Sequence, residues 1–292
     1  MRQDKEKSTV NARLKAVKHV ALDMDGTIYK GGTLFPFTIN ALRTLKDLNI
    51  RYSFLTNNPS KSTQEYLQHL RAIGIPAMLD EVYTSGQATI DYLQAHHPAM
   101  KRLFILGTPG MIVQFEEAGF ISTNDDPDDK PDAVVVAFDT SLVYSRLCRA
   151  AWWVAEKLPY IATNPDKVCP TDKPTVLVDC GSICAAIAQA TGRKPDIVIG
   201  KPASRMLEGI MQRYSLQPEE IAMVGDRIYT DIAMAKSTQA VGVLVLTGEA
   251  CPEDIEKSTI KPDIVVNDLS GFCEMLKEER SLNGKSCYVS VQ

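Results

Sequence analysis

The sequence lacks long apolar runs and an excess of positive charge. No uninterrupted apolar run approaches the roughly 18 residues that a membrane-spanning helix needs. The first 18 residues are polar and charged, unlike a secretory signal. Lysine and arginine number 32 against 36 acidic residues, a net charge of −4, so no broad basic surface for nucleic acid or a membrane is expected. These absences predict a cytoplasmic protein that binds any anionic ligand at a local binding site.

Several common binding motifs are also absent. The seven cysteines show no C-x-x-C spacing and no histidine pair near them, so zinc binding is not expected. Free thiols in a reducing cytosol are the simpler interpretation for all seven, at positions 148, 169, 180, 184, 251, 273 and 287. Neither G-x-x-x-x-G-K-[ST] nor G-x-G-x-x-G occurs, which excludes nucleotide binding through those two loops.

Short β-branched runs alternate with longer amphipathic stretches along the 292 residues. This alternation is typical of an α/β protein with a parallel sheet, and the length allows one large domain or two lobes. We expect strands at residues 19–22, 51–55, 102–106, 133–137, 160–162, 197–199, 221–224, 242–245 and 263–266. We expect helices at residues 36–48, 62–72, 108–118, 144–156, 180–191, 203–214 and 231–237.

Two carboxylates follow the first expected strand. Asp23 and Asp25 are separated by one residue, and a glycine and a threonine come directly after them. In an extended segment this spacing places both side chains on one side, at the carboxyl edge of the sheet where α/β proteins bind ligands. Two close carboxylates repel each other, and a hard cation such as Mg²⁺ relieves that repulsion. An acid pair that only caps a turn is the alternative.

Three later segments have compatible chemistry, although each has a simpler explanation. Gly225-Asp226 follows an apolar strand, and Asp231 comes where a helix should begin, so Asp231 could orient metal-bound water or only cap that helix. Thr56, Asn57 and Asn58 end another strand and could cradle an anion or cap a helix. Lys201 could neutralise a phosphate or lie free on the surface.

Taken in order, these segments resemble the four motifs of the haloacid dehalogenase-type phosphatases. The matching stretches are Asp23-Met-Asp-Gly-Thr-Ile-Tyr29, Thr56-Asn-Asn58, Gly200-Lys-Pro202 and Gly225-Asp-Arg-Ile-Tyr-Thr-Asp231. Ala162-Thr-Asn-Pro-Asp166 and Val245-Leu-Thr-Gly248 are similar to further segments of the branch that contains NagD-like and 4-nitrophenylphosphatase-like enzymes. The resemblance covers roughly residues 17–270.

The resemblance implies a Mg²⁺-dependent phosphatase that works through an aspartyl-phosphate. Asp23 resembles the nucleophile, and Asp25 resembles the general acid and base whose backbone carbonyl also reaches the metal. Asp226 resembles the third protein contact to Mg²⁺, with Asp231 behind it as an acid that orients the site. Thr56, the Asn57 backbone, Asn58 and Lys201 resemble the groups that bind phosphate. Asn164 and Asp166 are candidate substrate contacts from a cap domain, and turn capping is their alternative role.

The resemblance also implies a Rossmann-like core with an inserted α/β cap of the C2 type. The core would comprise residues 1–85 and 198–292, and the cap residues 86–197. The expected partner is a small phosphorylated metabolite, such as a sugar phosphate, a polyol phosphate or a nucleotide, and relatives often form homodimers through the cap. A phosphomutase and a non-catalytic phospholigand-binding protein are the competing functions.

Overall fold

The computed structural model describes residues 11–171 and 173–284, and the chain divides into two compact units. The first unit combines Met1–Phe54, Ile73–Ile75 and Ile210–Gln292, and the second combines Leu55–Ala72 and Pro76–Gly209. The sequence-based boundaries at residues 85 and 198 stay a prediction. Both units alternate strands with helices, as the sequence pattern indicates.

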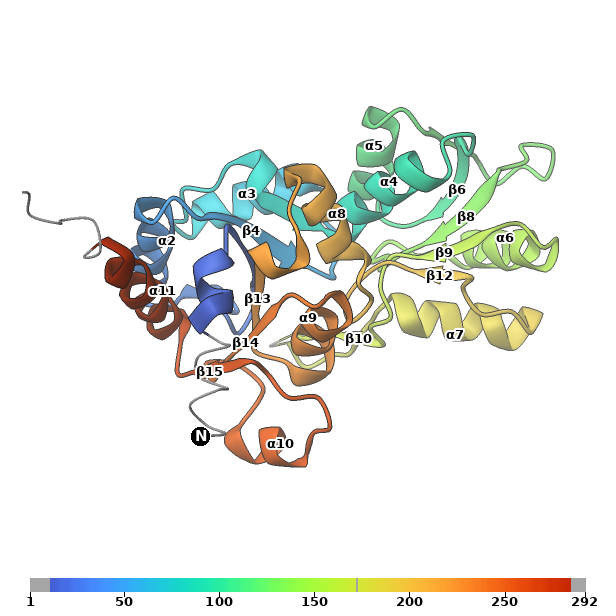
Figure 1. Ribbon diagram of the computed structural model, residues 1–292. Coiled ribbons are helices and arrows are strands. Elements are labelled where there is room, and N and C mark those ends of the chain that lie inside the picture. Colours follow the sequence, from blue (N-terminus) through green and yellow to red (C-terminus); the bar gives the residue numbers. More distant parts are fainter. Residues whose placement is uncertain (1–10, 172, 285–292) are drawn as a thin grey trace, which may run out of the picture. The chain divides into compact units, whose positions relative to one another are not determined.

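A six-stranded parallel sheet has the strand order β15-β14-β13-β1-β4-β5 (Figure 1). All five residues of β1, β13 and β14 are buried, which explains why these strands are almost wholly apolar. Two small strands form a hairpin after β1. The bounds are β1 (His19–Asp23), β2 (Tyr29–Lys30), β3 (Thr33–Leu34), β4 (Arg51–Thr56), β5 (Val82–Thr84), β13 (Ile221–Gly225), β14 (Val241–Val245) and β15 (Ile264–Val266).

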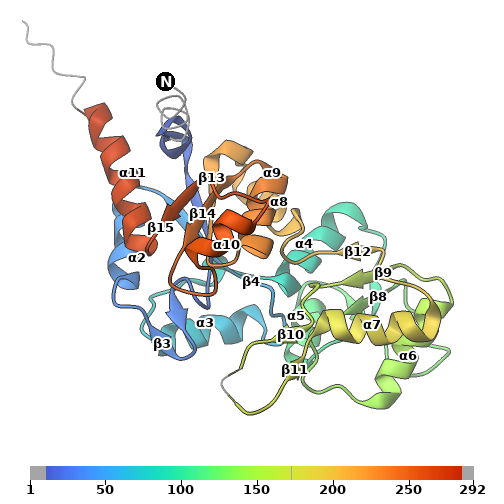
Figure 2. The ribbon, with the colours of Figure 1, turned by 90° about the horizontal axis from the view of Figure 1, so that it is seen from below.

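The helices of the first unit place their apolar sides on this sheet or on one another. Two of them, α2 and α11, lie side by side in both views of the ribbon (Figures 1 and 2). A π-helical turn, η3 (Ile228–Ile232), leads directly into α9 and so fixes the segment after β13. The bounds are α2 (Thr38–Asp47), α9 (Ala233–Thr238), α10 (Pro252–Lys257), α11 (Leu269–Gly284) and the 3₁₀ turn η2 (Pro218–Glu220).

The second unit contains a separate five-stranded parallel sheet with the order β12-β9-β8-β6-β7. Its central strands pack against α6 and α7 around the buried Trp153 and Ile183. The strands are β6 (Arg102–Leu106), β7 (Ile121–Ser122), β8 (Ala133–Val136), β9 (Tyr160–Ala162) and β12 (Ile197–Val198), with a hairpin of β10 (Val168–Cys169) and β11 (Leu177–Val178). The helices are α3 (Thr63–Ala72), η1 (Leu79–Glu81), α4 (Ser85–His96), α5 (Pro109–Glu117), α6 (Tyr144–Ala155), α7 (Cys180–Thr191) and α8 (Arg205–Tyr214), which ends in the first unit.

The predicted α/β class and all nine expected strands are confirmed, with bounds that differ by one residue at most. Strand β5 of the six-stranded sheet and the helices α4, α10 and α11 are not among the expected elements. The expected helix at residues 231–237 begins only at Ala233 because the π-helical turn occupies the preceding residues. Six cysteines of the described residues are free thiols, and Cys287 lies outside those residues. Every helix within 11–171 and 173–284 is too short or too polar to cross a bilayer.

The histidine at the start of β1 gives a prediction about pH and stability. His19 is fully buried, and its Nε2 lies 2.9 Å from the Ser53 Oγ. Burial, and then the charge of Arg51, lowers the pKa of His19 to about 3. An unfolded histidine has a pKa near 6.5, so as the pH falls the unfolded state takes up this proton first and stability is lost between those two values.

Between pH 7 and pH 5 this difference removes about 2 kcal/mol of unfolding free energy. From pH 7 to pH 5, the unfolding free energy of the variant His19→Gln should therefore fall by about 2 kcal/mol less than that of wild type, as measured by urea unfolding. His96→Gln, at the exposed end of α4, is the matched control and should follow the wild type. Equal losses in wild type and His19→Gln would contradict the prediction.

Candidate active site

Three buried carboxylates meet at one edge of the six-stranded sheet. Asp23 is the last residue of β1, Asp226 directly follows β13, and Asp231 lies in the π-helical turn η3. Strands β1 and β13 are parallel and in register from His19↔Ile221 onward, so both end at the same edge. One carboxylate oxygen from each aspartate lies within 4.8 Å of the other two. Strand ends far apart in the chain therefore place three acids in one cluster.

The electrostatics of this cluster favour a cation. Burial, followed by the negative charges of Asp23 and Asp231, raises the pKa of Asp226 to about 7. The Oδ1 atom of Asp226 is buried and has no hydrogen-bond partner in the described residues. Unpaired buried carboxylate oxygens are costly, and they are also the ligands that Mg²⁺ prefers. The three aspartates therefore fit a hard divalent ion.

Glycines make room for the cluster. A Cβ atom added to Gly26 would lie 2.5 Å from the Asp226 Oδ2, and one added to Gly248 would overlap the same carboxylate. A Cβ added to Gly225 would likewise collide with the side chain of Asp231. Gly26 also has a φ of +87°, which a residue with a side chain rarely adopts. The acids can approach one another because three facing positions carry no side chain.

Backbone amides hold two of the acids in place. The Glu249 amide donates to the Asp226 Oδ2 at 2.7 Å, and the Arg227 amide donates to the Asp231 Oδ2 at 3.1 Å. The Glu249 carboxylate in turn accepts from the Arg227 Nε and from the Tyr229 hydroxyl, both at 2.8 Å. This frame links the segment after β13 to the one after β14, so both loops position the carboxylates.

Asp25 lies outside this carboxylate cluster. Strand β1 ends at Asp23, and the chain then turns through Gly26, so the strand alternation that predicts a common side for Asp23 and Asp25 does not extend to Asp25. Asp25 is exposed, and its Oδ1 accepts a hydrogen bond from the Gly31 amide at 3.3 Å. The Asp25 carboxylate is therefore held by a hydrogen bond and exposed to solvent, which makes it accessible for proton transfer.

In the second unit, the Asn57 side chain binds the backbone of Lys201. Its Oδ1 accepts from the Lys201 amide at 2.7 Å, and its Nδ2 donates to the Lys201 carbonyl at 2.9 Å. A Cβ added to Gly200 would lie 2.6 Å from the same Oδ1, so a glycine is required there. The Asn57 side chain is therefore used to position Lys201, whose side chain is buried too.

Asn164 and Asp166 join the same network. The Asn164 Nδ2 donates to the Asn57 carbonyl at 2.9 Å, and its Oδ1 accepts from the Asp166 amide at 2.9 Å. The Asp166 Oδ2 accepts from the Asn57 Nδ2 at 3.0 Å. Asn164 is 1% exposed, so both ends of its amide are used inside the protein. The contact of the Asn164 Oδ1 with the Asp166 amide is a turn-capping contact, and the substrate contacts of Asn164 and Asp166 stay a prediction.

The side chains of Thr56 and Asn58 shape the turn after β4. The Thr56 Oγ1 accepts from the Asn58 amide at 3.1 Å, and the Asn58 Oδ1 accepts from the Ser60 amide at 2.9 Å. Hydrogen bonds in which a polar side chain accepts from the backbone amide two residues later are common in turns. Thr56 and Asn58 therefore stabilise this turn, whereas direct hydrogen bonds join Asn57, Asn164, Asp166 and Lys201 to one another.

Sequence reasoning missed two contributors to the acid cluster. Gly248 lies in a stretch that resembles the family, but nothing in the sequence indicates its close approach to Asp226. Glu249 gives no signal in the sequence, because it contacts Asp226 through its amide, which any residue except proline carries. Asp231 was expected behind the metal site, and the structure places it among the three carboxylates.

Two segments of the chain match models of known protein families. Residues 20–121 match the family of haloacid dehalogenase-like hydrolases, and residues 198–272 match a second, HAD-hydrolase-like family. The first match contains Asp23 and the second contains Asp226 and Asp231, so the two matched segments supply all three clustered acids.

Curated relatives cover most of the chain. An acid sugar phosphatase of Staphylococcus saprophyticus is 30% identical over 91% of this chain and 99% of its own length. The ribonucleotide monophosphatase NagD of Escherichia coli is 30% identical over 84% of this chain and 94% of its own length.

Solved structures share the whole fold. The 4-nitrophenylphosphatase of Thermotoga maritima is 40% identical, with a TM-score of 0.84 over 90% of this chain and 98% of that one. A glycerol phosphate phosphatase of Mycobacterium tuberculosis, crystallised with magnesium, is 29% identical, with a TM-score of 0.81 over 91% of this chain and 79% of that one. At this identity, coverage and TM-score the solved structures share the fold in which the three acids lie. The chain therefore belongs to the haloacid dehalogenase-like hydrolases, in the subfamily of NagD and the 4-nitrophenylphosphatases.

Proposed function

We propose that this protein is a Mg²⁺-dependent phosphatase that hydrolyses a small phosphomonoester. The observation that carries the proposal is the buried cluster of Asp23, Asp226 and Asp231, with its unpartnered carboxylate oxygen. Family membership supports it, since the related proteins named above are phosphatases. Asp23 and Asp226, with the backbone carbonyl of Asp25, would hold the ion, and Asp231 would orient the site. A bound Mg²⁺ supplies positive charge that offsets the negative charge of a phosphoryl group.

Hydrolysis needs a nucleophile and a group that moves protons, and two aspartates are suited to these roles. The Asp23 carboxylate attacks phosphorus, the bond from phosphorus to the leaving alcohol breaks, and an aspartyl-phosphate forms. Asp25 gives its proton to the leaving oxygen. It then takes a proton from a water whose oxygen bonds to phosphorus while the bond from phosphorus to the Asp23 oxygen breaks, which releases phosphate and restores both carboxyl groups. The burial of Asp23 and the exposure of Asp25 support this division, because the acid must exchange protons with solvent.

The residues proposed to bind the phosphate are Thr56, Asn57, Asn58 and Lys201. Positive charge and hydrogen-bond donors stabilise a transferred phosphoryl group, and the Lys201 ammonium would supply the charge. The Asn57 side chain already binds the Lys201 backbone. We therefore assign phosphate binding to the Asn57 backbone and a positioning role to its side chain.

The substrate class is inferred from the relatives and from the inserted unit. The named relatives act on sugar phosphates, ribonucleotides and glycerol phosphate, which are all small phosphomonoesters. We propose that residues 86–197 form the cap that excludes water and selects the leaving group, with Asp166 as its candidate substrate contact. Tyr144 and Trp152 on α6 are exposed, which supports a homodimer formed through the cap.

The experiment is a panel of phosphomonoesters assayed with Mg²⁺ in water labelled with ¹⁸O. A phosphatase should release phosphate from sugar phosphates, nucleotides or glycerol phosphate, and one ¹⁸O atom should enter each phosphate. EDTA should stop the release. A phosphomutase would move the phosphoryl group within the substrate without that label, and a protein that only binds phospholigands would release nothing. Either result would overturn the proposal.

A further inference from the structure

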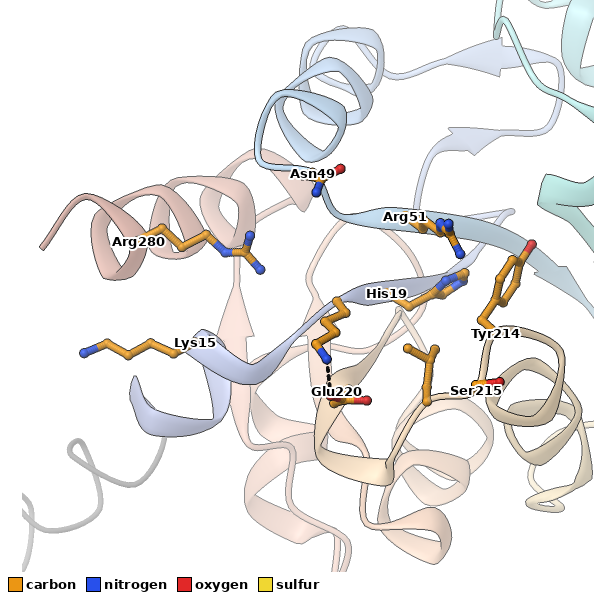
Figure 3. A pocket seen from close by; sticks show the side chains of 10 residues that line it. Lys15, His19, Asn49, Arg51, Tyr214, Ser215, Glu220 and Arg280 are labelled. Atoms are coloured by element: carbon orange, nitrogen blue, oxygen red, sulfur yellow. Dashed lines mark ion pairs between the residues drawn. The ribbon is translucent and has the colours of Figure 1, made fainter. Parts of the chain in front are cut away.

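A pocket of about 600 Å³ opens at the amino-terminal edge of the six-stranded sheet. Figure 3 shows that its lining residues come from several elements: His19 begins β1, Arg51 begins β4, Tyr214 ends α8, and Arg280 comes from α11. The pocket lies at the opposite end of β1 from Asp23, because His19 is the first residue of that strand and Asp23 the last. It is therefore separate from the carboxylate cluster.

Positive charge dominates the pocket lining. Four cationic residues line it against one acid, Glu220, which leaves a net charge of +3 with His19 neutral. Two of the cations have carboxylate partners, since Lys18 pairs with Glu220 at 2.5 Å and Lys15 with Glu279 at 3.6 Å. Among the described residues, Arg51 and Arg280 have no carboxylate partner. The pocket thus has an excess of uncompensated positive charge in a protein whose net charge is negative.

Hydrogen-bonding capacity remains unused at the same place. The Arg280 guanidinium donates through its two terminal nitrogens to the carbonyls of Leu48 and Val17, at 2.6 and 2.5 Å, but its Nε is buried without a partner. The Nδ1 of His19, on a side chain that is fully buried, is also without a partner. Buried polar atoms without partners are rare in native proteins, and two of them belong to residues that line this one pocket.

Arg51 is the group best placed to bind an anion. Its side chain is exposed, and its guanidinium lies 5.5 Å from the centre of the Tyr214 ring. No carbonyl, hydroxyl or carboxylate of the described residues accepts a hydrogen bond from that guanidinium. A guanidinium held by an aromatic face has lost conformational freedom while it keeps its five donors, and this fork of donors matches the geometry of phosphate.

We propose that this pocket binds a small organic phosphate. The charge and the free donors of Arg51 favour a phosphate dianion over a neutral ligand. The volume exceeds what a phosphate group alone would fill, and the Tyr214 ring, whose centre lies 4.7 Å from that of His19, offers an apolar wall for the organic part. Among the described residues, Glu220 supplies the only carboxylate that lines the pocket, and it is paired with Lys18. The pocket therefore lacks a free carboxylate from the described residues that could attack phosphorus, and we infer that it binds its ligand without hydrolysing it.

The test uses phenylphosphonate, whose phosphorus–carbon bond resists phosphatases, in the presence of EDTA. Binding is followed through the ring resonances of histidine, of which the chain has four. Only His19 lies in the first unit, because His69, His96 and His97 lie in the second. We expect a saturable shift of the His19 signal that weakens at high salt. No shift of this signal would overturn the proposal.

The variant Arg51→Gln should weaken phenylphosphonate binding at least about tenfold, since a hydrogen bond to a charged group is lost. Arg51→Lys keeps the positive charge but lacks the fork of donors, so its affinity for phenylphosphonate should lie between those of Arg51→Gln and wild type. The matched control is Arg43→Gln, an equal charge change at an exposed position of α2 that does not line the pocket. Wild-type affinity for phenylphosphonate in a folded Arg51→Gln variant would overturn the proposed site. An equal loss of affinity in Arg43→Gln would also overturn it, because it would show only non-specific electrostatic attraction. Thermal unfolding establishes that each variant is folded.

Discussion

Replacing Asp23 with asparagine should reduce the hydrolysis of 4-nitrophenyl phosphate by at least roughly 10³-fold, a loss expected when a covalent nucleophile is removed. The amide keeps the size of the side chain, but it cannot attack phosphorus or carry the phosphoryl group. The measurement is the initial rate of 4-nitrophenol release at saturating Mg²⁺ in a purified variant.

The matched control for this variant is Asp47→Asn, the same chemical change at an exposed position at the end of α2. It should retain the wild-type rate. The proposed role of Asp23 would be refuted if Asp23→Asn kept a substantial fraction of the wild-type rate while contaminating phosphatases were excluded. The phosphonate-binding pocket is unaffected by this result, because its test measures binding in the absence of metal.

Replacing Gly248 with alanine should cost the protein both Mg²⁺ binding and activity. The added methyl group would occupy the position of the Asp226 carboxylate, so Asp226 or the loop after β14 must move. A displacement of about 1 Å at a catalytic site lowers rates about 10²-fold, and overpacking destabilises a protein by about 1–3 kcal/mol.

The measurement is thermal unfolding with and without Mg²⁺, together with the rate of hydrolysis. A ligand at a hundred times its dissociation constant stabilises a protein by about 2.7 kcal/mol, and Gly248→Ala should lose most of that gain. Gly271→Ala in α11 is the control, since its methyl group would meet Val266 at an ordinary 3.5 Å. Wild-type stabilisation by Mg²⁺ in Gly248→Ala would mean that Asp226 does not bind the ion.

The strands and the clustered acids were accessible from the sequence for a physical reason. A strand buried on both faces must be apolar throughout, so β1 and β13 stand out as short runs, and a polar residue directly after each run marks the strand end. Parallel pairing then brings those ends to one edge of the sheet. Asp23 and Asp226 could therefore be placed near each other before the fold was known.

Other parts of the site depend on contacts that leave no pattern in the sequence. The role of Gly248 arises from its distance to Asp226 across two loops, and a glycine in a loop has many possible reasons. The Asn57 side chain binds the backbone of Lys201, 144 residues away. From the sequence alone, a role in capping the adjacent helix explains Asn57 equally well. The pocket around Arg51 combines residues from four separate segments, none of which forms a motif.

The pairing of β1 with β13 has a consequence for how the protein is made. His19 of β1 lies beside Ile221 of β13, so a ribosome must synthesise about 200 further residues before the first central strand finds this neighbour. All strands of the five-stranded sheet lie within that interval and can assemble earlier. Because contacts of such long sequence separation form slowly, the nascent chain carries an apolar strand whose edge toward β13 stays unpaired for that time, and unpaired apolar edges favour aggregation.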